Sequence, residues 1–458
     1  MTDASPIQTG PSPSSDSSSP STGQPDSPAG EVLAGVLETA ATDSSIRPQD
    51  DLFRFVNGGW LATAEIPADR PGSGAFTVLR DEAEAACRQI VEELADSFSA
   101  ASPEEASRAL ATNRGRVGAL YAAFMDDEHL EALGAGPLAG ELTPVLAAAS
   151  KEELARVLGG MTPIGFMGVV GADVEVDIND PERYTSWVGQ SGLGLPDESY
   201  YREEAQAPLR RAYVAHVARM LQLADLTDAF GTSAEDLAER VMAVETDLAK
   251  GHWDRVTCRD VEKMNNPMSW QEIVDSAPTL PWREWREGIR SAARSAGIEQ
   301  TTFLDEAIVT QPDYLPHAAR IWQETDLEDL KAWAAWHIVH GRATLLSGAF
   351  VEENFDFYGR TLQGTDELRA RWKRGVALVE SCLGEALGEI YVERHFPPSH
   401  KSAMEILVGR LIEAYRQSIS SLEWMSPATR ARALDKLALF TPKIGYPVRW
   451  RDYSAVEI

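Results

Sequence analysis

The residues best suited to metal chemistry are the eight histidines, and their spacing argues against a metal site within this chain. The His-Glu-x-x-His motif, which places two imidazoles on one helix face beside a general base, does not occur in the 458 residues. His337 and His340 lie three residues apart, but Trp333 in the same stretch indicates a packed core helix. His395 and His400 are separated by two prolines, which removes helical geometry. The sequence therefore predicts no catalytic residue and no metal ligand.

Two further stretches that contain ligand-type residues are not predicted to bind ligands. Residues 173–180 carry three aspartates and an asparagine, but they lack the glycine and the closing glutamate of a calcium-binding loop. A strand that ends in an Asn-Asp-Pro turn accounts for them. Residues 189–194, Gly-Gln-Ser-Gly-Leu-Gly, have no βαβ context and precede Pro196, so they predict a turn rather than a phosphate loop.

Composition excludes several classes of partner. The formal net charge is −29, from 71 acidic against 42 basic residues, which argues against binding to nucleic acid or to an anionic membrane. The apolar content of 43% is enough for a large core. Cys87, Cys258 and Cys382 are widely spaced, so we expect free, buried thiols rather than a disulfide framework.

Residues 1–30 are predicted to be a disordered tail, because they are almost entirely Ser, Pro, Thr, Gly, Asp and Gln. No apolar run approaches the ~20 residues that cross a bilayer, and no basic segment precedes an apolar one at the N-terminus. We therefore expect no membrane partner and no transmembrane segment, and a protein that is cytoplasmic or exported without a recognisable signal peptide. Residues 31–458 are expected to form the folded domain.

The folded part is predicted to be organised around residues 51–88. An apolar cluster at 52–61 suits one face of a short helix, and Asn57-Gly58-Gly59 is predicted to end that helix. A second helix is predicted from Phe76 onward, because apolar residues recur there at helical spacing.

The middle of the chain combines one β segment with helices. Residues 166–170 and 174–178 are rich in β-branched side chains, and 184–188 can return as a partner strand, which predicts a small β-hairpin sheet. Helices are predicted over 233–253 and 304–322.

The last third predicts four more helices, which are opened by capping residues and separated by proline. The predicted caps are Asp326, Thr365, Ser399 and Ser426, and Phe396-Pro-Pro398 is predicted to stop the second of these helices. The fold class is therefore mainly α, a large helical body with one small β-hairpin sheet.

Several blocks of the sequence resemble the neprilysin and endothelin-converting-enzyme family of zinc metalloendopeptidases. The first is VNGGWL, which is followed by EIPADR, GAF and LRDEAE. Later blocks, in family order, are QSGLGLPDESYY (190–201), FDFYGRTLQG (355–364), RWKRGVALVES (371–381), YVERHFP (391–397), LEWMSPATRARALDKL (422–437) and KIGYPVRWRDYS (443–454). Together they span nearly all of the chain after the tail. The chain is thus identified as a member of this family and is most similar to soluble bacterial zinc metalloproteases.

The resemblance implies a fold and an activity. In the family, two multiply connected lobes enclose a cavity that holds zinc, and this chain corresponds to the helical lobe. The complete enzyme is expected to hydrolyse peptide bonds in small peptides, with zinc polarising the carbonyl and a glutamate activating water. The family's zinc ligands follow the KIGYP block. We therefore expect no cofactor in this chain, and a truncated N-terminal peptidase domain that is inactive alone.

The resemblance also suggests one substrate-binding residue. In the family, an arginine in the loop before the GAF-like segment and an aspartate just after its phenylalanine bind the C-terminal carboxylate of the substrate. Aligned on Phe76, these positions hold Gly72 and Thr77 in this sequence. Arg70, two residues earlier, is the remaining candidate for substrate binding, and a structural or surface arginine is the alternative.

Two hypotheses remain for the chain as a whole. It is either an incomplete record of a full metalloendopeptidase or a non-catalytic peptide-binding or scaffold protein that retains the helical lobe. The end of the chain inside a family block favours the first. In both cases the expected partners are small peptides and the missing catalytic module or a partner chain. The 52–61 cluster and residues 444–458, with Trp450, Tyr453 and Val456, are expected to leave apolar surface uncovered.

Overall fold

The computed structural model describes residues 41–299 and 301–458. The chain divides into two compact units, Met1–Ile66 and Pro67–Ile458. The predicted disordered tail, residues 1–30, lies outside the described residues. The predicted domain, residues 31–458, includes parts of both units. Among the described residues, no helix combines the length and the apolar character that crossing a membrane requires.

In the first unit, helix α2 (Leu52–Leu61) runs through Asn57-Gly58-Gly59 without a break, so the predicted helix end at these residues is wrong. The reason is a close approach that only glycine allows. A Cβ atom on Gly58 would lie 2.5 Å from the Cβ of Asp43, and Asp43 N donates to Phe55 O at 2.8 Å. This packing offsets the cost of about 1 kcal/mol that glycine imposes on a helix interior.

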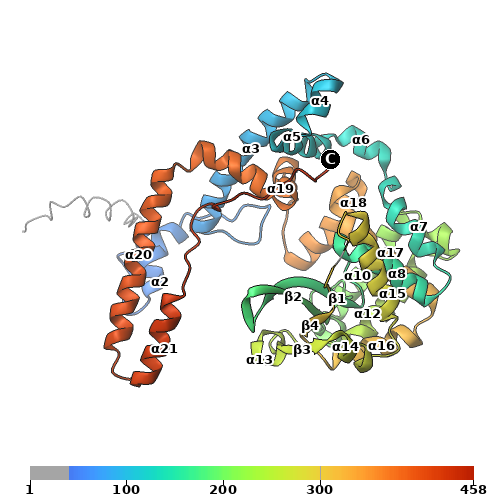
Figure 1. Cartoon of the computed structure of the whole chain (residues 1–458). Coiled ribbons are helices and arrows are strands. Elements are labelled where there is room, and N and C mark those ends of the chain that lie inside the picture. Colours follow the sequence, from blue (N-terminus) through green and yellow to red (C-terminus); the bar gives the residue numbers. More distant parts are fainter. Residues whose placement is uncertain (1–40, 300) are drawn as a thin grey trace, which may run out of the picture. The chain divides into compact units, whose positions relative to one another are not determined.

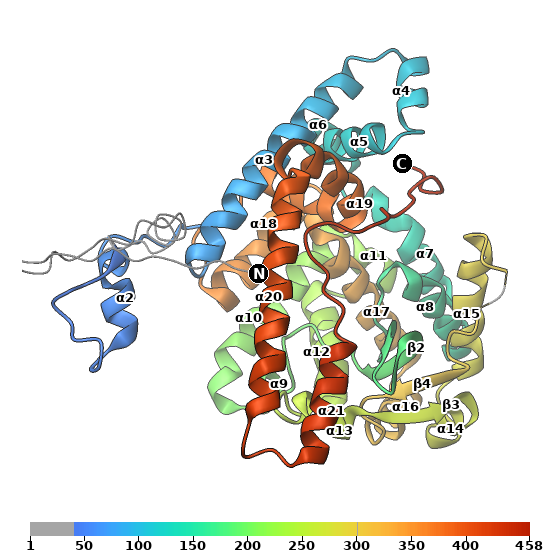
Figure 2. The ribbon, with the colours of Figure 1, turned by 60° about the vertical axis from the view of Figure 1, so that its left-hand side comes forward.

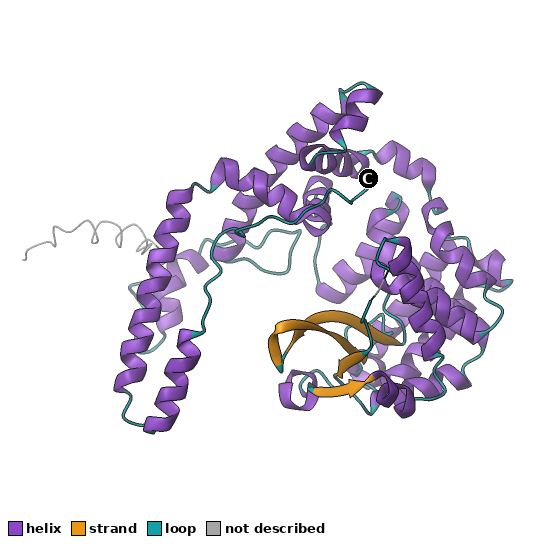
Figure 3. Ribbon diagram, viewed as in Figure 1, coloured by secondary structure: helices purple, strands orange, loops and turns teal. Residues whose placement is uncertain are grey.

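The second unit is mostly helical (Figures 1 and 3), and its helices surround two buried apolar clusters. The smaller cluster lies between α3 (Ala75–Ser99), α5 (Asn113–Met125) and α19 (Arg371–His395). The short helix α4 (Pro103–Ala109) connects α3 to α5. The helix predicted from Phe76 onward is confirmed as α3.

Tyr453 belongs to the smaller cluster, so the prediction that it would lack cover is wrong. It is 6% exposed, and its hydroxyl accepts a hydrogen bond from Glu385 N at 3.2 Å. Arg116 holds the same stretch by donating to the carbonyls of Ser454 and Val456 at 3.1 and 2.9 Å. Helices α5 and α19 of the chain itself thus cover the aromatic ring.

The larger cluster is formed by longer helices and by the short segments between them. The longer helices are α7 (Ala139–Ala147), α8 (Lys151–Met161), α10 (Ala207–Leu223), α12 (Ala234–Ala249), α15 (Trp282–Ser295), α16 (Tyr314–Glu324) and α17 (Leu327–Arg342). The short α-helices are α6 (Asp127–Leu133), α9 (Ser199–Arg202), α11 (Leu226–Phe230), α13 (Val261–Met264), α14 (Trp270–Ser276) and α18 (Gly348–Asn354). Single turns are η2 (Gly136–Leu138), η3 (Thr162–Ile164), η4 (Glu204–Gln206), η5 (Thr257–Arg259) and η6 (Ala343–Leu345), and a π-helix, η7 (Phe355–Gln363), follows α18. Helix α17 is at the centre, and Trp333 and Trp336 are both 0% exposed.

A four-stranded sheet with the order β1-β2-β4-β3 packs into this body. Its strands are β1 (Val170–Asp177), β2 (Asp180–Gln190), β3 (Asn266–Ser269) and β4 (Glu306–Val309). Strands β1 and β2 form the long antiparallel hairpin in Figure 3, β2 pairs with β4 in parallel, and β3 pairs with β4 in antiparallel fashion. The predicted hairpin is confirmed, although residues 166–169 precede the strand.

Several predicted helix boundaries are wrong. The helix predicted over 233–253 ends at Ala249, and Ser399 lies inside a helix that begins at Pro398 rather than capping it. The helix predicted over 304–322 begins only at Tyr314, because the run Glu306–Val309 is strand β4. A run of four residues is too short for its periodicity to separate strand from helix. Thr365 does not cap α19, which begins at Arg371. Instead its N–H donates to Gly359 O at 3.0 Å and closes the end of η7.

The chain continues into two helices, α20 (Pro398–Ser421) and α21 (Pro427–Ala438), which run side by side as an antiparallel pair (Figures 1 and 2). The predicted cap at Ser426 is confirmed, since its Oγ accepts from Thr429 N at 3.2 Å. The predicted stop at Phe396-Pro-Pro398 is also confirmed. Neither helix contains a buried residue. The predicted fold class, mainly α with one small sheet, is confirmed.

Candidate functional site

Arg70 lies in the loop before α3 and is already bound by two carboxylates. Its Nε donates to Asp69 Oδ1 at 3.0 Å, and its Nη1 donates to the two oxygens of Asp81 at 3.0 and 3.1 Å. Lys373 Nζ donates to Asp69 Oδ2 at 2.6 Å and so ties this loop to α19. The Arg70 side chain is 10% exposed and that of Asp81 is 42% exposed. A peptide carboxylate would therefore have to replace Asp81, and the substrate-binding role of Arg70 stays a prediction.

The histidines of the described residues do not form a metal site. His395 and His400 are exposed near the junction of α19 and α20. His337 and His340 lie on α17, where His337 packs against Trp333 with ring centroids 4.9 Å apart. No three His, Cys, Asp or Glu side chains in the described part of the chain gather so that they could hold a metal ion. These residues do not fit zinc. The prediction that the chain itself contains no zinc remains untested.

The three cysteines differ in exposure. Cys87, Cys258 and Cys382 are all free. Cys87 is buried, and burial raises the pKa of its thiol to about 11, so this thiol is unreactive at neutral pH. The expectation of buried thiols is wrong for Cys382, which is exposed on α19, and Cys258 is only partly buried.

The turn predicted at residues 189–194 is held by side chains from several helices. Tyr314 Oη donates to Ser191 O at 3.1 Å, and Trp333 Nε1 donates to Gly192 O at 3.0 Å. Tyr358 Oη donates to Gly194 O at 2.9 Å. Gly192 has φ +93°, a conformation that favours glycine. These bonds satisfy the backbone of a buried loop and fix its path.

A buried carboxylate lies beneath this loop. Glu245 of α12 is 0% exposed, and it accepts from Tyr201 Oη at 2.7 Å and from Tyr213 Oη at 3.0 Å. His337 Nε2 lies 3.0 Å from its Oε1. Tyr201 Oη also accepts from Leu195 N at 3.0 Å. Glu245 therefore connects α9, α10 and α17 to the loop.

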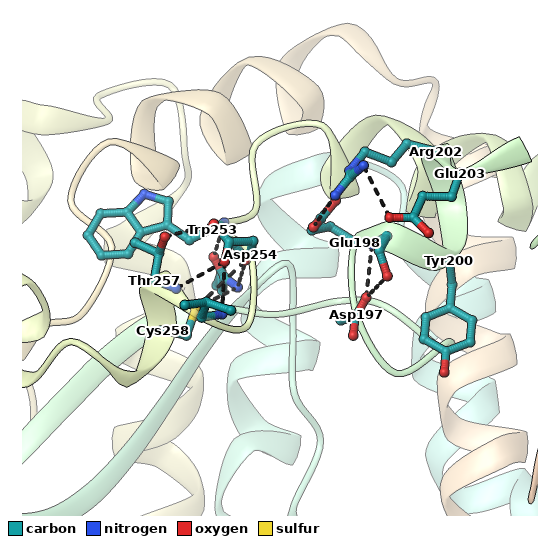
Figure 4. Close-up of polar contacts among 12 residues, drawn as sticks. Asp197, Glu198, Tyr200, Arg202, Glu203, Trp253, Asp254, Thr257 and Cys258 are labelled. Atoms are coloured by element: carbon teal, nitrogen blue, oxygen red, sulfur yellow. Dashed lines mark hydrogen bonds and ion pairs between the residues drawn. The ribbon is translucent and has the colours of Figure 1, made fainter.

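An open groove of about 590 Å³ lies beside Tyr201. One wall is α9 with Glu198 and Arg202, and the other is the end of α12 and the turn that follows it. The lining residues are Glu198, Tyr201, Arg202, Thr246, Ala249, Lys250, His252, Trp253, Asp254 and Thr257. Figure 4 shows that the labelled polar side chains form two groups, one around Glu198 and Arg202 and one around Asp254 and Thr257.

The polar groups of the groove have partners within the chain. Arg202 Nε donates to Glu198 Oε2 at 2.5 Å, which raises the pKa of Arg202. Thr257 Oγ1 and N donate to Asp254 at 2.7 and 3.0 Å, which lowers the pKa of Asp254. Burial lowers the pKa of His252 to about 4, so its ring is neutral at pH 7. The groove thus contains no side chain whose shifted pKa lies near 7.

Sequence reasoning did not identify the groove or Glu245. One signal was present for Glu245, because it occupies a position of α12 between the buried Val244 and Leu248, where a carboxylate is rare. The groove wall also includes Tyr201, which ends the block QSGLGLPDESYY. The second wall comes from residues about fifty positions later, which no local pattern relates to the first.

Comparison with known proteins identifies the protein family of this chain. The model of peptidase family M13 matches residues 48–447. A neutral endopeptidase of Lactobacillus helveticus is 24% identical over 420 residues, which are 91% of this chain and 61% of the relative. Human neprilysin is 23% identical over 429 residues, which are 88% of this chain and 55% of that protein. The chain belongs to peptidase family M13.

Solved structures agree with this assignment. The zinc metalloprotease Zmp1 of Mycobacterium tuberculosis, in complex with an inhibitor, superposes with a TM-score of 0.80 and 43% sequence identity. The match covers 91% of this chain and 60% of Zmp1. PepO of Lactobacillus rhamnosis, at 23% identity and a TM-score of 0.72, shares the fold. The neprilysin-like fold is therefore confirmed, and the chain spans about half to three-fifths of the length of its relatives.

Proposed function

We propose that the chain is the helical part of a zinc metalloendopeptidase and that it holds small peptides against a zinc-bearing module. That module is either a further part of the same protein or a partner chain. The similarity to Zmp1, at 43% identity over 91% of the chain, carries the proposal. The missing fit for zinc among the described residues supports it, because a metalloendopeptidase requires ligands that these residues do not provide.

In this proposal the chain contributes binding and positioning, and no step of hydrolysis is assigned to its residues. Asp69 holds the Arg70 loop on α19 through Lys373, and Asp81 holds Arg70 on α3. Arg70 is the proposed contact for a C-terminal carboxylate, which would take the place of Asp81. One relative is named a neutral endopeptidase and Zmp1 is named a zinc metalloprotease, which favours this proposal over a non-catalytic scaffold.

Complementation tests the proposed function. The 458-residue chain alone is expected to bind no stoichiometric zinc by elemental analysis and to cleave no quenched fluorescent peptide. Co-expression with the part of Zmp1 that this chain does not match should yield a complex that contains one zinc and cleaves the peptide. One tightly held zinc in the chain alone, removed by a chelator together with activity, would contradict the proposal.

The role of Arg70 has its own test in the assembled enzyme. Asp81→Ala should lower KM for peptides with a free C-terminal carboxylate, because it removes both acceptors of Arg70 Nη1, while KM for amidated peptides stays unchanged. Arg70→Gln should raise KM for the free carboxylate only. Equal effects on both kinds of peptide would show that Arg70 only anchors the loop.

A further inference from the structure

Three histidines meet in the core between α10, α17 and η7. His216 is 0% exposed, and its ring stacks on Phe357 with centroids 5.0 Å apart and planes at 11°. His340 lies 4.7 Å from the Tyr358 ring and 5.3 Å from the Trp336 ring. The π-helix is thus attached to α10 and α17 through imidazole contacts. π-Helical segments are rare and occur frequently at functional sites.

Two ring nitrogens of this region, His216 Nε2 and His340 Nδ1, are buried without a hydrogen-bond partner among the described residues. Native cores leave few such atoms. The described residues do not form a metal site here.

Two of the three histidines face a carboxylate. His216 Nδ1 lies 2.8 Å from Glu353 Oε1. The second oxygen of Glu353, Oε2, accepts a hydrogen bond from Arg219 Nε at 2.6 Å. His337 Nε2 lies 3.0 Å from Glu245. Each of these rings therefore lies beside a carboxyl group, although burial still lowers the pKa of His216.

His340 has no such partner. The groups that influence its charge are His337 on its own helix, His216 on α10 and Asn354 on α18, and Tyr358 packs against it from η7. The two histidines become cations when they are protonated, and none of the four groups is a carboxylate that could offset a positive charge on His340. Burial, followed by the two neighbouring histidines, lowers the pKa of His340 to about 4.

We propose that His340 is an acid-sensitive point of the helical core, at which protonation releases the π-helix η7 from α17. His340 is only partly exposed, and an imidazolium at such a position without a neighbouring anion is costly. The ring regains hydration if η7 moves away, so acid favours the released state. Tyr358 then loses its hydrogen bond to Gly194 O, which is 2.9 Å long in the folded core. The loop beside the groove would loosen with η7.

The same release would reach the loop that contains Arg70. The chain leaves η7 at Gly364 and reaches Glu367, whose N–H donates to Ala68 O at 3.0 Å. Arg369 Nη2 then donates to Glu84 Oε1 at 2.5 Å. A fall in pH would thus affect both the loop beside the groove and the loop that contains Arg70, through the movement of η7. This inference goes beyond the proposed function, because it requires neither zinc nor peptide hydrolysis.

Hydrogen–deuterium exchange of the full chain at pH 7 and pH 5, corrected for intrinsic rates, tests the inference. In wild type, residues 355–363 should lose protection about twentyfold, since a ring with pKa 4 when packed and 6.5 when released favours opening by that factor. The protection of helix α12 from exchange should fall by a smaller factor. His340→Phe, which keeps a ring against Tyr358, should clearly reduce the extra loss, with His216 on Phe357 accounting for what remains. The control His129→Gln, at an exposed position of α6, should behave as wild type.

Two outcomes overturn the proposal: the same twentyfold loss in His340→Phe, or an equal loss in η7 and α12. If His340→Phe does not fold, His340→Gln and the ring titration of His340 by NMR in wild type replace it. A ring that titrates near pH 6.5 while residues 355–363 keep their protection also overturns the proposal.

Discussion

Tyr201 Oη donates to Glu245 Oε2 at 2.7 Å while it accepts from Leu195 N, so one hydroxyl connects a fully buried carboxylate to the backbone of the loop beside the groove. Tyr213 supplies a second donor to the same carboxylate at 3.0 Å. The shape of the groove wall therefore depends on a carboxyl group that is inaccessible to solvent.

Replacement of Glu245 should destabilise the fold. Glu245→Leu leaves two tyrosine hydroxyls without their acceptor, and we expect a loss of about 3 kcal/mol in the free energy of unfolding. Glu245→Gln keeps one acceptor oxygen and should lose about half as much. Urea denaturation measures both. Glu239→Gln, at an exposed position of the same helix, is the control. If Glu245→Gln and Glu239→Gln are equally stable, the network does not stabilise the core.

The crossing of α8 and α15 depends on two glycines. A Cβ atom on Gly159 would lie 2.0 Å from Trp285 O, and one on Gly288 would lie 2.1 Å from Arg156 O. Gly159→Ala forces two backbones apart, so it should cost about 3 kcal/mol of unfolding free energy. Gly140→Ala in α7 meets nothing within 4 Å and should stabilise by up to about 1 kcal/mol. A neutral Gly159→Ala would show that the helices can separate without loss.

Local signals in the sequence were sufficient for much of the fold. Ser426 before a proline gave the start of α21 correctly, because a cap depends only on residues in the same turn. Helix α3 followed from its apolar spacing. Thr365 was misread because it has the chemistry of a cap, but its N–H is used by the π-helix before it. Nothing local distinguishes these two uses.

Features that depend on tertiary contacts were not predictable from one sequence. Gly58 resembles a helix breaker until Asp43 is found packed against it. Strand β4 is stabilised by pairing with β2 and β3, which are distant in sequence. Arg70 could be located in its loop, but its ion pair with Asp81 shows only in three dimensions. The same holds for the two walls of the groove.

Acid should destabilise the chain through His252 as well as through its carboxylates. The pKa of His252 is about 4 in the folded chain because the ring is buried, and about 6.5 when the chain is unfolded. The stability that depends on its neutral form is present above pH 6.5 and is lost as the pH falls towards 4. Between pH 7 and 5 this loss of unfolding free energy is about 2 kcal/mol.

His252→Gln should therefore lose less unfolding free energy than wild type between the two pH values, as measured by urea denaturation. His400→Gln, at an exposed site, serves as the control. Equal losses in wild type and His252→Gln would exclude this contribution.

Helix α20 has an apolar stripe that no described residue buries. Leu407, Leu411 and Tyr415 follow one another at intervals of four and are 49%, 51% and 62% exposed. Removing apolar surface from water is favourable by about 25 cal/mol per Å². The stripe should therefore bind a hydrophobic dye and promote self-association.

Leu411→Glu should reduce both dye fluorescence and the size measured by light scattering, without loss of unfolding free energy, because the site is already in water. Ser402→Glu adds the same charge on the opposite side of α20 and is the matched control, which should change neither property. If Leu411→Glu lowers stability by more than about 1 kcal/mol, the leucine is buried in solution and the stripe is already covered. If both variants reduce association equally, added charge rather than the apolar stripe accounts for the effect.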